Sequence, residues 1–166
     1  MTVFSQEQQA AINSMGGLLV SAGAGSGKTA VLIEHLIFWI EKNVTKNATS
    51  EWEISLELKK LIVITFTVKA SEEMKMRLFE RLEEAIHSLK DQEATNSELN
   101  FWMKIKRNLH AIYIGTIDGL FVRVIKNNTD LLPISVSFEI VSDQLWNNKL
   151  KKLFNSRLNT LEEEDK

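Results

Sequence analysis

The chain has 166 residues, of which 44% are hydrophobic and 25% charged, so it is long and apolar enough for one globular domain with a core. It has no cysteine, which excludes a disulfide framework and a cysteine-based metal site. Its formal net charge of −2 gives no general attraction for nucleic acid, so any such contact must come from a local surface. Since neither a signal peptide nor a membrane-spanning run is visible, we expect a cytoplasmic protein with no membrane partner.

The first predicted element is a short helix that Ser5 can cap and that runs through Asn13. Glycines end this helix, and the apolar run Leu18–Ser21 then predicts a strand that is buried on both faces, because its hydrophobicity does not alternate. The spacing of apolar residues predicts an amphipathic helix over Lys28–Lys42. His35 lies on the apolar face of that helix, and we expect a packed residue there rather than a metal ligand.

Between that strand and that helix lies a glycine-rich loop with the form of a phosphate-binding loop. Glycines let backbone N–H groups approach a phosphate, and the following helix adds the positive end of its dipole. The Lys28 ammonium would contact the β- and γ-phosphates as the catalytic cation, and the Thr29 hydroxyl would bind Mg²⁺. A flexible linker is disfavoured, because the loop joins a strand-like run to an amphipathic segment. The predicted nucleotide-binding residues are Ala22 (where the strict pattern has glycine), Gly23, Ala24, Gly25, Ser26, Gly27, Lys28 and Thr29.

The middle of the chain predicts a loop, a strand and a long helix. Asn43–Ser55 is polar and is predicted to be a loop. The β-branched run Leu61–Phe66 predicts the second strand. Apolar residues at helical spacing predict a helix over Ala70–Leu89, with Glu73 and Arg77 forming a favourable i,i+4 pair on its exposed face.

The last third of the chain continues the alternation of strands and helices. The predicted elements are a helix over Ser97–Leu109, a strand over Ala111–Ile114, a helix over Asp118–Lys126, a short strand over Val136–Val141 and an amphipathic helix over Asp143–Leu158, with Asp143 as its N-cap. Repeated strand–helix units predict an α/β fold in which a parallel sheet carries helices on both faces. Ligands of such sheets bind at the carboxyl ends of the strands, so the three strand ends should share one edge.

One of those strand ends carries hydroxyls, an aromatic ring and a cation just before a helix. Thr65–Lys69 could contact a phosphodiester backbone, and Phe66 could stack on a base. The structural alternative is that Phe66 packs under the end of the strand and Thr67 merely caps the helix. The segment Gly115–Asp118 is the third strand end.

Four segments together resemble superfamily 1 DNA helicases of the UvrD/Rep type, and most closely the RecB/AddA-like helicase–nuclease branch. Ser21–Leu32 (SAGAGSGKTAVL) resembles that family's Walker A motif, including the alanine, and Ile64–Met74 (ITFTVKASEEM) resembles motif Ia. Gly115–Phe121 (GTIDGLF) resembles the motif usually read as TIHSFC, and Phe4–Ile12 (FSQEQQAAI) resembles the N-terminal Q motif. The four motifs stand in the family's order and span most of residues 1–143.

The resemblance implies a P-loop NTPase fold of the RecA-like type, with a sheet that is incomplete in this chain. Residues 1–143 would be the front part of the ATP-binding domain, and residues 144–166 would begin a following helical region that is truncated. Gln8 would read the adenine of ATP. Asp118 stands where the family usually has His, and Gly119 and Leu120 replace the usual Ser-Phe, so we expect no direct phosphate contact by Asp118. The residues that would contact single-stranded DNA are Thr65, Phe66, Thr67, Lys69 and Thr116.

The implied cofactors are ATP and Mg²⁺. The implied partners are single-stranded DNA and duplex ends, a second RecA-like domain and a partner subunit of a nuclease complex. The acidic pair and the arginines that hydrolysis requires are missing from residues 1–166. We therefore expect the front part of a helicase, expressed as a fragment or encoded by a truncated gene, that alone binds ATP weakly at most and neither hydrolyses it appreciably nor unwinds DNA.

Two alternatives to a helicase remain open. One is a P-loop NTPase of another class, such as a small-molecule kinase or an assembly ATPase. The other is a non-catalytic binding module with a vestigial loop. The Thr65–Met74 segment favours the helicase, because a small-molecule kinase has no need of it.

Overall fold

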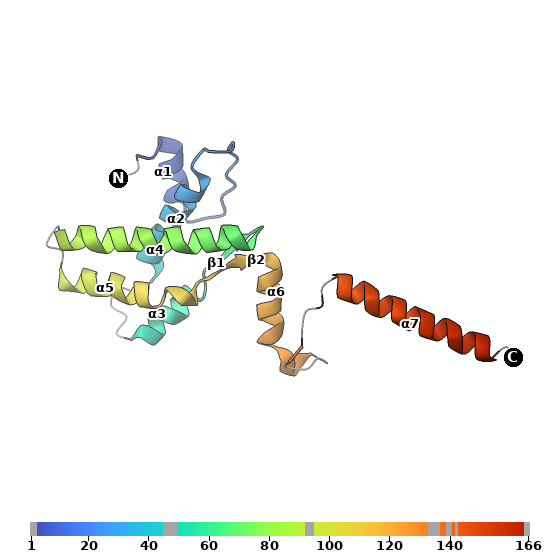
Figure 1. Ribbon diagram of the computed structural model, residues 1–166. Helices are drawn as coiled ribbons and strands as arrows, with labels where there is room; N and C mark the ends of the chain where they lie inside the picture. Colours follow the sequence, from blue (N-terminus) through green and yellow to red (C-terminus); the bar gives the residue numbers. More distant parts are fainter. Residues whose placement is uncertain are drawn as a thin grey trace. The chain divides into compact units, whose positions relative to one another are not determined.

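The computed structural model contains several helices and a small parallel sheet, and it describes residues 3–44, 50–91, 95–132, 137–138, 141 and 143–164 (Figure 1). The chain divides into two units, Met1–Val122 and Arg123–Lys166. In chain order the elements are α1 (Gln6–Ile12), α2 (Lys28–Asn43), α3 (Glu51–Leu58), β1 (Ile62–Thr65), α4 (Val68–Asp91), α5 (Asn96–Arg107), a 3₁₀ turn η1 (Leu109–Ala111), β2 (Tyr113–Thr116), α6 (Ile117–Lys126), a second 3₁₀ turn η2 (Thr129–Leu131) and α7 (Asp143–Glu164).

The sheet consists of β1 and β2, which run parallel with Ile62 opposite Tyr113 and Thr65 opposite Thr116. Val63 and its neighbour Ile114 are buried, and α4 packs against both strands. The predicted parallel pairing is therefore confirmed. Helices on both faces are not found within the described residues, because Ile62 and Ile64 on the opposite side of β1 are 53% and 49% exposed.

The core of the first unit lies along α4. Its side chains at every fourth position face inward, as the apolar spacing predicted. Helix α2 packs on one side of α4, α5 lies beside it, and α3 packs against α5 and η1 (Figure 1). The fully buried side chains come from several of these helices and from the residue that follows α2: Ile40, Val44, Ile54, Leu58, Leu78, Leu82 and Ile105.

Helix α3 corrects the loop predicted over Asn43–Ser55. The Ser50 hydroxyl accepts a hydrogen bond from the backbone N–H of Glu53, and the Glu53 carboxylate accepts one from the Ser50 N–H. This capping box starts the helix, and burial of Ile54 and Leu58 holds it against the core. Its signature, a serine followed three residues later by glutamate, was present in the sequence but was not used. Residues 45–49 lie outside the described part of the chain.

The strand predicted over Leu18–Ser21 is wrong. These residues form no regular structure, and Leu18, Leu19 and Val20 are 54%, 94% and 47% exposed rather than buried. A strand exists only where a neighbour accepts its backbone hydrogen bonds, and the described strands β1 and β2 pair with each other. An apolar run indicates the tendency to form a strand but supplies no partner.

The other boundaries differ by a few residues. The helix from Ser5 is confirmed as α1, with Ser5 as its cap, and the long middle helix is confirmed as α4. Strand β2 begins two residues later than predicted, because η1 occupies the chain up to Ala111. Most of the strand predicted over Val136–Val141 lies outside the described residues, as does the side chain of Asp143.

Helix α7 belongs to the second unit, and its described apolar side chains, including Leu145 and Trp146, are exposed. Among the described helices none is both long enough and apolar enough to cross a membrane.

Candidate functional site: a phosphate-type loop and two strand ends

The loop before α2 turns on two glycines in the left-handed backbone region. Gly25 has φ +76° and Gly27 has φ +80°, and side chains other than hydrogen rarely tolerate these angles. Gly27 also occupies the N-cap position of α2, so the loop runs directly into that helix. The sequence predicted a loop followed by a helix start here, and the structure confirms both.

The Lys28 side chain folds back into this loop. Its ammonium donates hydrogen bonds to the carbonyl oxygens of Ala22 at 2.7 Å and Gly23 at 2.5 Å. The Ser26 hydroxyl donates to the same Gly23 carbonyl at 2.8 Å. The loop therefore surrounds a positive charge. Because all of these groups are exposed, an anion could replace the carbonyls as the partner of the ammonium.

Thr29 lies in the first turn of α2, directly after Lys28, and is half-buried. Its hydroxyl is the oxygen that the sequence assigns to Mg²⁺. The described residues contain no cluster of three or more His, Asp or Glu side chains that could hold a metal by themselves. One protein oxygen nevertheless suits Mg²⁺, which usually keeps several waters and binds phosphate oxygens as well.

Gln8 connects α1 to the loop. Its amide oxygen accepts from the Ser5 N–H at 2.8 Å, and its amide nitrogen donates to the Ser26 carbonyl at 3.1 Å. A Cβ at Gly27 would lie 3.2 Å from that nitrogen, so the loop approaches Gln8 closely. Each amide atom is used once, which leaves one lone pair and one N–H for a ligand. The structure thus brings Gln8 into contact with the loop at Ser26, which lies 18 residues further along the chain.

The two other strand ends lie side by side, because the register pairs Thr65 with Thr116. The Thr65 hydroxyl donates to the Thr67 carbonyl at 3.0 Å, and the Thr67 hydroxyl accepts from the Ala70 N–H at 3.1 Å. Thr67 therefore caps the first turn of α4, as the structural alternative held. The other half of that alternative is wrong, because Phe66 is fully exposed at 104% and packs under nothing.

The remaining residues of this edge are Lys69 and Thr116. Lys69 is exposed in the first turn of α4. The Thr116 hydroxyl accepts from the Gly119 N–H at 3.1 Å, and the Thr116 carbonyl accepts from the Tyr113 hydroxyl at 2.8 Å. Sequence reasoning did not single out Tyr113. The only available signal was an aromatic residue two positions before a glycine in a strand.

An ion pair joins the helix that follows the loop to the helix that follows Phe66. The Arg81 guanidinium of α4 donates through two nitrogens to both carboxylate oxygens of Glu34 in α2, with 3.1 Å for the longer contact. The side chains are 32% and 20% exposed, and the hydrogen bond to Glu34 raises the pKa of Arg81 against the effect of burial. Because these residues are 47 positions apart in the sequence, no local sequence pattern predicts the ion pair.

Removing this pair should weaken the packing of α2 on α4. We expect Arg81→Met to lower the free energy of unfolding by about 1–2 kcal/mol, because it leaves a half-buried Glu34 carboxylate without its donor. The matched control is Arg77→Met, one turn earlier, whose pair with Glu73 lies within α4 and is 48% exposed on both sides. Arg77→Met should lower the free energy of unfolding by less than about 0.5 kcal/mol. Urea unfolding of both variants measures the difference, and equal losses would contradict the prediction.

His35 is packed, as predicted. Its Nδ1 lies 2.8 Å from the Ile12 carbonyl oxygen, so it ties α2 to the end of α1.

Comparison with known proteins agrees with this arrangement. The model of the UvrD/REP helicase N-terminal domain family matches residues 4–166. The chain belongs to this family. Membership in the UvrD/REP family implies a P-loop NTPase fold, of which the structure shows a two-stranded parallel sheet and the helices packed on it. The family match also confirms the resemblance that we inferred from the four motifs, and it excludes the small-molecule kinase and the assembly ATPase as alternatives.

Individual UvrD/REP relatives carry helicase names. The chain is 35% identical over 143 residues to an ATP-dependent helicase/nuclease subunit of Thermoanaerobacter sp. (strain X514), and the match covers 86% of this chain and 10% of the relative. It is 37% identical over 140 residues to the protein of that name from Clostridium botulinum (strain Alaska E43 / Type E3), covering 84% and 10%. The exonuclease/helicase subunit RexA of Lactococcus lactis subsp. cremoris (strain MG1363) is 33% identical over 139 residues, covering 83% and 10%. The chain thus spans about a tenth of the length of these relatives.

Proposed function

We propose that this chain supplies the ATP-binding front part of an ATP-dependent DNA helicase motor. In the complete protein, ATP hydrolysis would drive movement along single-stranded DNA and the unwinding of duplex ends. Residues 1–143 would form the front part of a RecA-like domain, and residues 144–166 would begin a following helical region. The names of the relatives, which contain the words helicase, nuclease and subunit, support the helicase activity and a partner subunit of a nuclease complex. We propose in addition a second RecA-like domain and a cytoplasmic location.

The nucleotide side of the proposal is the loop from Ala22 to Thr29 together with Gln8. Lys28 would exchange two carbonyl partners for phosphate oxygens, which replaces neutral hydrogen bonds with charge-assisted ones. Thr29 would provide one oxygen to Mg²⁺, whose role is to neutralise charge on the phosphates. Gln8 retains one donor and one acceptor, the pair that an adenine edge requires.

The DNA side is the edge formed by the ends of β1 and β2. The register that sets Thr65 beside Thr116 is the observation that supports this side most, because residues 51 positions apart meet where each strand leads into a helix. Hydroxyls suit phosphate oxygens, and the exposed ring of Phe66 suits a stacked base. Thr67 and Lys69 would complete the contacts.

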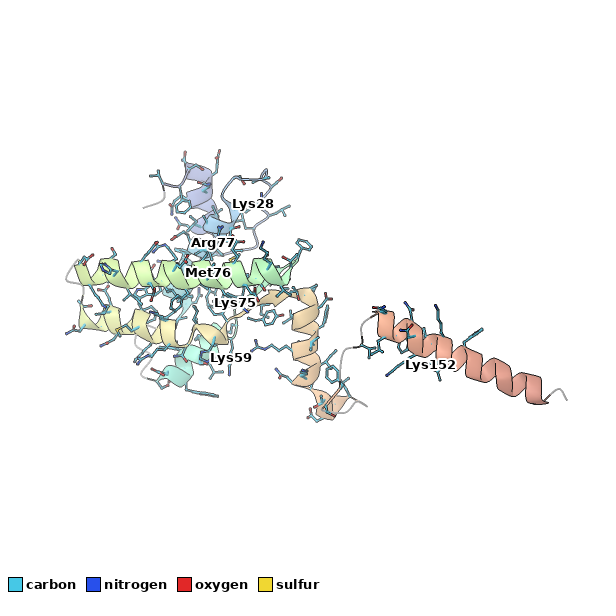
Figure 2. The ribbon with its side chains drawn as sticks, viewed as in Figure 1. Lys28, Lys59, Lys75, Met76, Arg77 and Lys152 are labelled. Atoms are coloured by element: carbon cyan, nitrogen blue, oxygen red, sulfur yellow. The ribbon has the colours of Figure 1, made fainter. Side chains whose placement is uncertain are left out.

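A salt-dependent binding experiment tests the proposal. We expect the chain to bind a fluorescent oligothymidylate, and Lys69→Gln to weaken binding a few-fold while reducing the slope of log K against log[salt] by about 0.7, the value for one contact to a single strand. Lys75→Gln is the control, since Lys75 is also exposed on α4 but lies farther from its start (Figure 2). Absence of binding, or equal slopes for the two variants, would refute the DNA side.

A further inference from the structure

Tyr113 lies folded along β2 toward the proposed DNA edge. It is half-buried, and its hydroxyl donates to the Thr116 carbonyl oxygen at 2.8 Å, three residues along the chain. Thr116 is the last residue of β2, and its own hydroxyl accepts from the Gly119 N–H in the first turn of α6 at 3.1 Å. One side chain therefore fixes the backbone at the point where the strand becomes the helix.

Two glycines provide the space for this side chain. A Cβ at Gly115 would lie 2.6 Å from the Tyr113 hydroxyl oxygen and 2.8 Å from ring atom Cζ. A Cβ at Gly119 would lie 2.8 Å from the same oxygen, with no ring atom within 4 Å. Real Cβ atoms almost never approach other atoms so closely. The strand can therefore hold Tyr113 in this position only with glycine at both places.

This packing accounts for a departure from the family pattern. The sequence has Gly119 where related motifs usually have serine, and a serine would collide with the Tyr113 hydroxyl. Tyr113 and Gly119 thus form a matched pair.

The Thr116 hydroxyl is oriented as a consequence. Because its oxygen accepts from Gly119, its hydrogen remains available to donate, and a phosphate oxygen is the acceptor that a DNA backbone offers. We propose that Tyr113 is a positioning residue of the DNA edge. It holds the Thr116 backbone so that the Thr116 hydroxyl and the first turn of α6 face the bound single-stranded DNA in one fixed orientation. This inference rests on the proposed function, because it presumes that Thr116 contacts DNA.

The first test removes only the hydroxyl. We expect Tyr113→Phe to weaken oligothymidylate binding by about three- to ten-fold, the range that one lost hydrogen bond at a binding edge produces. Binding of Mg·ATP at the Lys28 loop should not change. A merely structural Tyr113 would leave DNA affinity unaltered at temperatures where the variant is folded, and that result would overturn the inference.

The second test uses the geometry of the two glycines. A Cβ at Gly119 would lie 2.8 Å from the Tyr113 hydroxyl oxygen and 3.3 Å from the Thr116 hydroxyl oxygen. Gly119→Ala should therefore weaken DNA binding in the wild-type chain but add much less loss to Tyr113→Phe, because the nearer of the two oxygens is then absent. Gly115→Ala is the matched control and should remain harmful in both backgrounds, since ring atom Cζ still collides. Additive losses for Gly119→Ala and Tyr113→Phe would overturn the inference.

The third test uses the fact that the chain contains a single tyrosine. Fluorotyrosine incorporation therefore gives one ¹⁹F signal, which should shift on addition of oligothymidylate and stay unmoved by Mg·ATP. A shift with wild-type affinity supports the inference, and an unmoved signal at saturating DNA overturns it. If the wild-type chain binds no DNA, the proposed function fails at its DNA side. If the wild-type chain binds DNA but the ¹⁹F signal of Tyr113 does not shift, only this inference fails.

Discussion

Replacing Lys28 with methionine is expected to lower the affinity for Mg·ATP by about ten- to a hundred-fold, which corresponds to the loss of one hydrogen-bonded charge. Methionine matches the apolar stem of the lysine side chain but lacks the ammonium. In the free chain that ammonium binds the carbonyls of Ala22 and Gly23, and both are exposed, so water can replace it. The free energy of unfolding should therefore change little.

The measurement is a titration with Mg·ATP at millimolar concentration, because weak binding is expected. The backbone amide signals of Gly25 and Gly27 report on the loop itself. Lys42→Met is the control: Lys42 lies in the last turn of the same helix, where its ammonium is 5.7 Å from the centre of the Phe38 ring. Wild-type affinity in Lys28→Met, or an equal loss in Lys42→Met, would refute the role of Lys28.

Replacing Phe66 with alanine is expected to weaken binding of single-stranded DNA by about five- to a hundred-fold, since stacking on an aromatic ring contributes ~1–3 kcal/mol per base. At 104% exposure the ring makes no packing contribution to the fold. The free energy of unfolding should therefore remain that of the wild type, which separates a binding role from a structural one. Phe66→Trp should retain most of the affinity, because a larger ring still stacks.

Phe79→Ala is the matched control for this experiment. Phe79 is another exposed phenylalanine of the chain, on α4, but the centre of its ring lies 4.7 Å from the Lys106 ammonium in a groove formed with α5. Its loss should leave DNA affinity unchanged wherever the variant is folded. Fluorescence anisotropy with an oligothymidylate compares the variants. Equal affinities for wild type and Phe66→Ala would remove Phe66 from the DNA edge.

The local parts of this molecule follow from its sequence. The helix periodicity of α4 and α2 predicted both elements, because each residue's choice of face depends only on neighbours three and four positions away. The same holds for the loop, in which Gly25 and Gly27 adopt positive φ angles, and for Thr67, which caps the helix next to it. The motifs were also sufficient to predict the family.

Contacts between distant segments were decided only by the tertiary structure. Leu18–Ser21 has the composition of a strand, yet it remains irregular, because strand formation depends on a hydrogen-bonded neighbour that composition does not specify. Gln8 against Ser26 and Arg81 against Glu34 depend on how α1, α2 and α4 pack. The sequence by itself was sufficient to predict the phosphate-type loop and the two strand ends. Only the parallel register brought Thr65 beside Thr116, because pairing over such a separation depends on the packing of the whole sheet and its helices.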